Sequence, residues 1–152
     1  MKQLKIIQAK PNPAGKDRYM GIAPAQQLAG EWVDIENVGD ESFSFEDTKL
    51  QHVAYSPAYP NGVWTDVMSF KGSLKTREIM RVHSGLLTPL LPIDSQGADY
   101  HLFSGKNYVW NNDVKDTTRL INKVSGVEVD KAGYVSPPPD GKILKRSGNY
   151  LV

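Results

Sequence analysis

Apolar residues in this chain occur in short bursts that Gly, Pro, Asn and Asp interrupt. No window of a dozen residues keeps the i, i+3, i+4, i+7 spacing of a surface helix, so strands are the natural interpretation of the bursts. Many short strands separated by turn residues are typical of β-sandwiches. The pattern therefore predicts an all-β domain, an immunoglobulin-like β-sandwich of about eight or nine short antiparallel strands.

Nine segments carry the strand pattern, namely residues 4–9, 31–37, 42–45, 49–55, 66–70, 78–83, 108–110, 117–122 and 126–129. Alternation is clearest in EWVDIEN (residues 31–37). Val33 and Ile35 point to one face of this strand, whereas Trp32 and Asp34 point to the other. We expect the first face to be buried and the second to be mostly solvated, as in an antiparallel sheet with one wet side.

Three stretches do not have the strand pattern: residues 11–30, residues 86–103 and the C-terminal tail. Connections as long as the first two are often binding loops or disordered segments. Pro137, Pro138 and Pro139 end regular structure, which divides the chain into a domain over residues 1–135 and a Pro-rich, then basic, tail over residues 136–152. Ile143 and Leu144 could add an edge strand, or the tail could hang free.

Composition excludes several classes of function. The chain has no cysteine, which removes disulfide frameworks, thiolate catalysis and cysteine-based zinc sites. Its 18 basic and 17 acidic side chains leave a net charge of +1, too little for a long-range field that steers nucleic acid or anionic membrane. We expect a soluble protein, cytoplasmic by default, because there is neither a signal-peptide pattern nor an apolar run of membrane-spanning length.

Two blocks of the sequence resemble the lamin tail domain, an immunoglobulin-like β-sandwich. The first is EWVDIENVGDESFSF (residues 31–45), and the second is YVWNNDVKDTTRLINKVSGVEVDKAGY (residues 108–134). Between them, REIMRVHSG (residues 77–85) is similar to the family's middle strand, which ends in a glycine. The resemblance spans residues 4 to 134 and implies a stand-alone domain of the bacterial type, without the coiled-coil rod or the fused hydrolase of other members.

The shared residues also have physical explanations that concern folding. Trp110 is large enough to fill the space between two sheets about 10 Å apart. Asn111, Asn112 and Asp113 tolerate left-handed conformations and suit a tight turn. Gly126 fits a turn with positive φ. These blocks therefore predict a fold and do not predict a catalytic site.

The histidines do not suggest an enzyme. His52, His83 and His101 lack metal-ligand spacing, and we interpret them as solvent-facing strand or loop residues. His83 and Ser84 are neighbours on a strand and point to opposite faces, so they are not a ready catalytic pair. The sequence predicts no enzymatic activity, no cofactor and no metal, although an enzyme in which His83 or His101 meets distant acidic residues is a third-ranked alternative.

Oxygen-bearing side chains at Asn111, Asn112, Asp113 and Asp116 could in principle hold calcium. They lack the spacing and the sharp-turn glycine of a calcium loop. Asn and Asp dominate turns for backbone reasons alone, so we favour a turn here.

The candidate interaction surface consists of three aromatic and three basic residues: Tyr55, Tyr59, Trp64, Lys142, Lys145 and Arg146. Exposed aromatics on a loop suit protein-binding or sugar-stacking surfaces. Our leading hypothesis is a structural or protein-interaction module that binds another protein or itself through sheet edges and the loops at residues 56–65 and 86–103. The alternative is an accessory module that targets DNA or polysaccharide, with the basic tail contributing weak, salt-sensitive binding.

Overall fold

The computed structural model describes residues 3–88, 91–93 and 95–152, and the regular structure in these ranges is twelve strands and one short helix. The elements are β1 (Leu4–Lys10), α1 (Ala25–Ala29), β2 (Trp32–Asn37), β3 (Phe43–Ser44), β4 (Thr48–Ser56), β5 (Tyr59–Ser69), β6 (Ser73–Leu74), β7 (Ile79–His83), β8 (Tyr100–Phe103), β9 (Asp116–Asn122), β10 (Glu128–Tyr134), β11 (Leu144–Ser147) and β12 (Tyr150–Leu151). The prediction of an all-β domain is confirmed.

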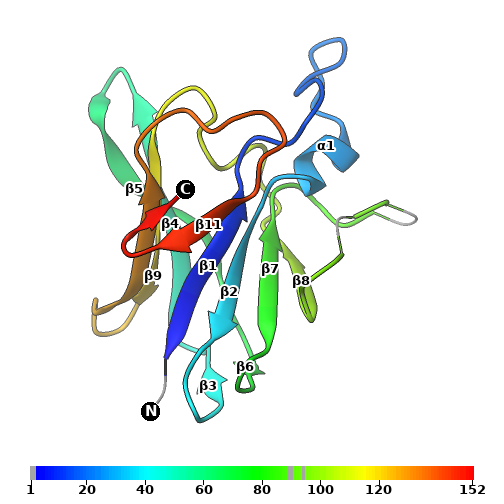
Figure 1. The fold of residues 1–152 in the computed structure, drawn as a ribbon. Coiled ribbons are helices and arrows are strands. Elements are labelled where there is room, and N and C mark those ends of the chain that lie inside the picture. Colours follow the sequence, from blue (N-terminus) through cyan, green and yellow to red (C-terminus); the bar gives the residue numbers. More distant parts are fainter. Residues whose placement is uncertain (1–2, 89–90, 94) are drawn as a thin grey trace.

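Ten strands form one curled sheet in the order β5-β4-β9-β10-β12-β11-β1-β2-β7-β8, while β3 and β6 form a separate ribbon. The curling gives a half-barrel: β1, β2, β7 and β8 lie side by side, and β4, β5 and β9 lie on the other side of β11 (Figure 1). The expected sandwich and its strand number are not confirmed, because strands of the tail join the two halves into one sheet. The expectation of purely antiparallel pairing is wrong, since β7–β8 and β10–β12 are parallel.

The core lies between the two halves of the sheet. Val33 and Ile35 of β2 are fully buried in the same cluster as Leu50 of β4 and Leu120 of β9. Trp110, which is 3 % exposed, belongs to this cluster, as the sequence predicted. Apolar residues from both halves therefore bury one another, and this burial is the main stabilising contribution of the fold.

The other face of β2 is also buried, so the prediction that it is mostly solvated is wrong. Trp32 and Asp34 are both 0 % exposed. Arg81 of β7 forms an ion pair with Asp34, and its guanidinium carbon lies 3.7 Å from the centre of the Trp32 ring. The backbone at Gly97 comes close to this guanidinium, which places part of the segment between β7 and β8 over that face.

Two long connections and one predicted strand differ from expectation. Residues 11–30 include α1, and residues 86–103 end in β8, which pairs with β7 through Met80↔Tyr100 and its neighbours. Residues 89, 90 and 94 of the second connection lie outside the described residues. Residues 108–110 form no strand, because two of their backbone N–H groups bond a side chain and not a neighbouring strand. Gly126 has the predicted positive φ, at 75°.

The C-terminal tail lies between the two halves of the sheet. Its strand β11 pairs with β1 through Gln8↔Lys145 and Ala9↔Leu144, and β12 pairs in parallel with β10. Arg146 forms two hydrogen bonds to Asp130, at 2.9 and 3.1 Å. Both side chains also bond the backbone of Ile6, next to a register shift in β1. The tail thus connects the sheet at the point where β1 is irregular.

Candidate functional site

The loop between β8 and β9 (residues 104–115) is anchored from one side by the carboxyl group of Glu31. This group is 1 % exposed and accepts hydrogen bonds from the backbone N–H of Val109 (2.6 Å) and Trp110 (3.0 Å) and from the hydroxyl of Ser84 (2.5 Å). A buried N–H without a partner costs about 1–3 kcal/mol, so the carboxyl replaces the sheet partner that this stretch lacks.

Burial also sets the protonation state of Glu31. Desolvation raises its pKa from 4.5 to about 8, against the opposing effect of the hydrogen bond from Ser84. All three donors meet the same oxygen, Oε1, so Oε2 is left to carry the proton. Glu31 therefore acts as a neutral acceptor near pH 7, which avoids a buried charge.

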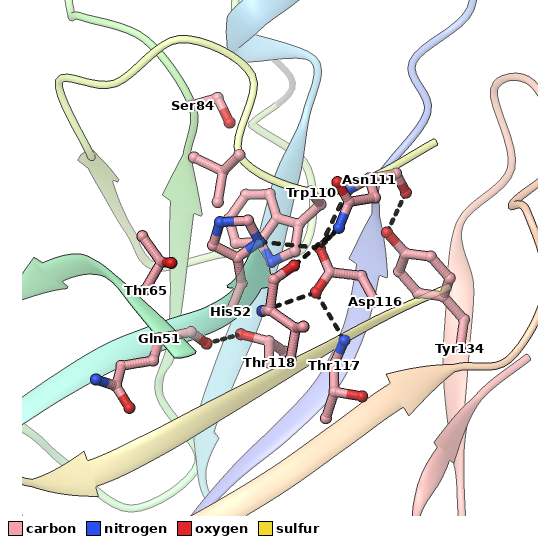
Figure 2. A network of polar contacts seen from close by, with 12 residues as sticks. Gln51, His52, Thr65, Ser84, Trp110, Asn111, Asp116, Thr117, Thr118 and Tyr134 are labelled. Atoms are coloured by element: carbon pink, nitrogen blue, oxygen red, sulfur yellow. Dashed lines mark hydrogen bonds and ion pairs between the residues drawn. The ribbon is translucent and has the colours of Figure 1, made fainter. Parts of the chain in front are cut away.

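Asp116 anchors the loop from the other side. Its carboxylate accepts hydrogen bonds from the backbone N–H of Val53 (3.0 Å), Asn111 (3.0 Å) and Thr117 (2.7 Å). The side chains of His52 (3.0 Å) and Asn111 (2.9 Å) complete the set, and Figure 2 shows Asp116 at the centre of these partners. A carboxylate that accepts so many bonds from the backbone and from fixed side chains fits a structural anchor.

Asn111 links the Asp116 network to β4 and β10 through further hydrogen bonds. Its side-chain amide donates to the carbonyl of Val53 at 2.9 Å, and its own carbonyl accepts a hydrogen bond from the hydroxyl of Tyr134. Asn111 was predicted to be a turn residue, but it lies at the junction of β4, β9 and β10. Figure 2 shows Tyr134 approaching it from the side opposite His52.

The anchored loop in turn holds the segment between β1 and α1. The Tyr108 hydroxyl donates to the carbonyl of Asp17 at 2.5 Å, and the Asn112 amide donates to the Asp17 carboxylate at 3.0 Å. Burial raises the pKa of Tyr108 to about 12, which keeps its hydroxyl protonated as a donor. Through Asp17, the segment between β1 and α1 is therefore hydrogen-bonded to the loop between β8 and β9.

This segment carries a tight turn, residues 19–22, which we call the apolar turn. Tyr19 and Ile22 exchange backbone hydrogen bonds of 2.8 and 3.0 Å, and Met20 and Gly21 between them both have positive φ, at 51° and 80°. Positive φ at both central residues is typical of a type I′ turn, and it is uncommon for methionine. Tyr19, Met20 and Ile22 are 69, 86 and 72 % exposed.

The predicted aromatic residues lie on the β4–β5 hairpin. Tyr55 is half-buried on β4, Tyr59 at the start of β5 is 55 % exposed, and Trp64 lies 4.0 Å beneath the guanidinium of Arg119. The contact between Trp64 and Arg119 is a cation–π pair that links β5 to β9.

The predicted basic residues lie in the tail. Lys142 and Lys145 are exposed, whereas Arg146 is half-buried and paired with Asp130. The structure therefore brings Arg146 to an acidic partner within the fold.

The interpretation of the histidines as solvent-facing is wrong for His83 and His52, whereas His101 is half-buried. His83 is 0 % and His52 is 8 % exposed. His83 Nδ1 lies 2.6 Å from the carbonyl of Ala29, which can only accept, so Nδ1 carries the proton and Nε2 accepts from His101 Nδ1 at 2.8 Å. Burial lowers the pKa of His83 to about 4, and its ring stacks on Phe103 with centroids 4.7 Å apart.

These side chains are bound to structural partners. Within the described ranges, no group of three or more His, Asp or Glu side chains is arranged to hold a metal ion. The described helix is also too short and too polar to span a membrane. The chain matches no protein-family model and no curated protein. The fold and the site thus describe an all-β protein whose ten-stranded curled sheet carries, at one end, loops held by the carboxyl groups of Glu31 and Asp116.

Replacing Glu31 by Gln is expected to remove a pH dependence of stability. The native state retains a proton that the unfolded chain releases above pH 4.5, so the stabilisation is complete below pH 4.5 and is lost as the pH rises to about 8. The free energy of unfolding of the wild type should therefore fall between pH 6.5 and 8, by at most about 1.4 kcal/mol per pH unit.

Urea denaturation across that range, in the wild type and in Glu31→Gln, measures this effect. The amide retains an acceptor oxygen without an ionisable proton, so the slope should flatten in the variant. His83 does not interfere, because a lowered pKa reduces stability only as the pH falls below 6.5. Equal slopes for the two proteins would contradict a protonated Glu31.

Proposed function

We propose that this chain is a non-catalytic protein-interaction module with lamin-tail-like, immunoglobulin-related architecture. In this interpretation the two halves of the curled sheet act as the two layers of a sandwich. The proposal is supported by a contact between the two blocks that carry the resemblance: Glu31 from the first block bonds the backbone of Val109 and Trp110 from the second. The acidic residue and the tryptophan then belong to one structural motif.

The apolar turn is the observation that carries the proposal. Aromatic and methionine side chains are enriched at protein interfaces, and a turn whose backbone is already fixed loses little backbone entropy when a partner buries it. The turn is fixed by its own backbone bonds and by the attachment of Asp17 to the anchored loop. Met20 is 86 % exposed and does not contribute to the core, so its side chain is accessible to a partner.

Neighbouring residues extend this surface. Leu86 and Leu87 are each 65 % exposed, and Leu86 lies against Gly105 of the anchored loop. The segment that bears the apolar turn projects from the same end of the molecule as α1 (Figure 1). Gly85 lies against Leu28 of α1, so exposed apolar residues from two connections, β1–α1 and β7–β8, lie near this helix, which favours a protein partner there.

The edge of β5 is a weaker candidate for the interaction surface. β5 ends the sheet order, and Tyr59 and Val63 on it are 55 and 38 % exposed. A free edge can accept a strand from a partner. However, Pro60 lacks a donor and Asp66 adds charge, and both features protect edges against pairing. The edge of β5 is therefore less suited to binding a partner than the apolar turn.

Replacing Met20 and Ile22 together by Ser should weaken partner binding at least tenfold without changing stability, because both side chains are exposed and hot-spot residues each contribute about 1–2 kcal/mol. Sedimentation velocity of the purified protein measures self-association. A photo-crosslinking residue at position 20 in native-host extract captures other partners, and binding is then remeasured with the purified captured protein.

Val124→Ser is the matched control, since Val124 is 77 % exposed at the tip of the β9–β10 hairpin, away from the apolar turn. A monomeric wild type that yields the same crosslinks from position 124 as from position 20 would overturn the proposal.

A further inference from the structure

A groove of about 770 Å³ crosses the outer face of the sheet over β4, β9, β10 and β12. Thr117, which alternates with the buried Asp116 and Thr118, lies on its floor together with Gly133. A Cβ at Gly133 would lie 2.6 Å from the Thr117 hydroxyl, so only glycine keeps the floor flat at this point. The groove is thus a formed feature of the sheet surface.

Tyrosines form two walls of the groove. Tyr55 of β4 stands on one side, and its ring lies directly on Gly62, where a Cβ would come within 3.0 Å of the ring. Tyr150 of β12 stands on the other side and is 53 % exposed. β4 and β12 are three strand spacings apart, roughly 14 Å, which is longer than one sugar ring.

Polar groups line the rest of the groove. Asn61 and Asn149 supply amides, which both donate and accept hydrogen bonds. The charged lining residues are Lys115, Lys131, Glu128 and Asp130, two of each sign, so their formal charges cancel. Lys131 and Glu128 are 3.9 Å apart, and Asp130 is paired with Arg146 from beneath.

We propose that this groove binds a neutral oligosaccharide. The apolar faces of sugar rings stack on tyrosine rings, while their hydroxyls exchange hydrogen bonds with amide and charged side chains. The cancelled charge gives a polyanion such as DNA no net attraction, so polysaccharide is the better of the two ligand classes. The site goes beyond the proposed protein-interaction function and lies on a different surface from the apolar turn.

The experiment is a screen of the full-length chain on a glycan array, followed by calorimetric titration with neutral hexasaccharides (cellohexaose, xylohexaose, mannohexaose and chitohexaose) and with duplex DNA at about 50 and 200 mM salt. We expect binding to a neutral glycan, insensitive to salt and tighter for longer chains until the groove is filled. Tyr150→Ser should weaken it about tenfold, as loss of one stacking platform implies.

Tyr100→Ser is the control, because Tyr100 is a tyrosine of similar exposure, 47 %, that does not line the groove. Lys131→Ala, an exposed change without core contacts, gives a second variant in which weaker binding cannot reflect unfolding. Absence of any neutral glycan ligand, salt-dependent binding to DNA alone, or glycan binding unchanged by Tyr150→Ser and Lys131→Ala would each overturn the proposal. The Met20/Ile22 double variant should retain sugar binding, which separates this test from that of the protein-interaction function.

Discussion

Replacing Asp116 by Ala is expected to lower the free energy of unfolding by at least about 4 kcal/mol. The change deprives the backbone N–H groups of Val53, Asn111 and Thr117 of their acceptor. These donors are partly buried, and each hydrogen bond to a charged group contributes about 1.5–3 kcal/mol, while His52 loses its partner as well. Urea denaturation measures the loss, and hydrogen exchange at Val53 and Asn111 shows whether the anchored loop opens.

Two further variants separate the anchor from general effects in this region. Asp113→Ala, an exposed change in the same loop, should stay within about 0.5 kcal/mol of the wild type. Asp116→Asn keeps one acceptor oxygen but directs an NH₂ group toward donors that need an acceptor. Its free energy of unfolding should therefore lie between those of Asp113→Ala and Asp116→Ala. A stability for Asp116→Ala equal to that of Asp113→Ala would show that the network does not stabilise the fold.

The parts of this fold that depend on local pattern were predictable from the sequence. Val33 and Ile35 alternate with a period of two, and this spacing alone fixes which face of β2 is apolar. Gly126 lies where the short stretch between two predicted strands ends, at a point that needs a left-handed turn residue, and it has the expected positive φ. Both conclusions rest on neighbours along the chain, so no knowledge of the tertiary structure was required.

The anchoring residues depend on contacts that the sequence does not display. Glu31 bonds Val109 across 78 positions, and Asp116 bonds Val53 across 63. Glu31 is the first residue of the block EWVDIENVGDESFSF, and Asp116 is one of several oxygen-bearing residues near Asn111, but nothing local distinguishes an anchor from a surface carboxylate. An acidic residue directly beside a buried tryptophan or at the start of a strand is the signal that could have drawn attention to them.

The architecture was harder to predict than the strand content. The sequence of the basic tail predicts an edge strand or a free end, because its charged residues favour contact with solvent. Its position between the two halves depends on Arg146 meeting Asp130, and on β12 pairing with β10 in parallel. Pairing between distant strands is set by the whole fold, and a period of two along one strand does not select its neighbour.

Burial of both faces of β2 is another consequence of distant contacts, and it leads to the second large prediction. Asp34 and Arg81 lie 47 positions apart and form two hydrogen bonds, of 2.7 and 2.8 Å, with both side chains almost fully buried. Gln8 donates to Asp34 at 2.8 Å, and Trp32 lies under the guanidinium. Asp34→Leu should cost about 3–5 kcal/mol, because it removes the carboxylate that pairs with the buried guanidinium of Arg81.

A double-mutant cycle distinguishes this cost from simple loss of packing. Arg81→Met alone leaves a buried carboxylate with only Gln8 as a described partner, and it should also cost about 3–5 kcal/mol. The double variant Asp34→Leu/Arg81→Met leaves no buried charge, so it should be more stable than either single variant and lie within about 2 kcal/mol of the wild type. If the two single effects simply add in the double variant, the pair is not coupled. The burial of both faces of β2 would then rest on Trp32 and the segment that covers it.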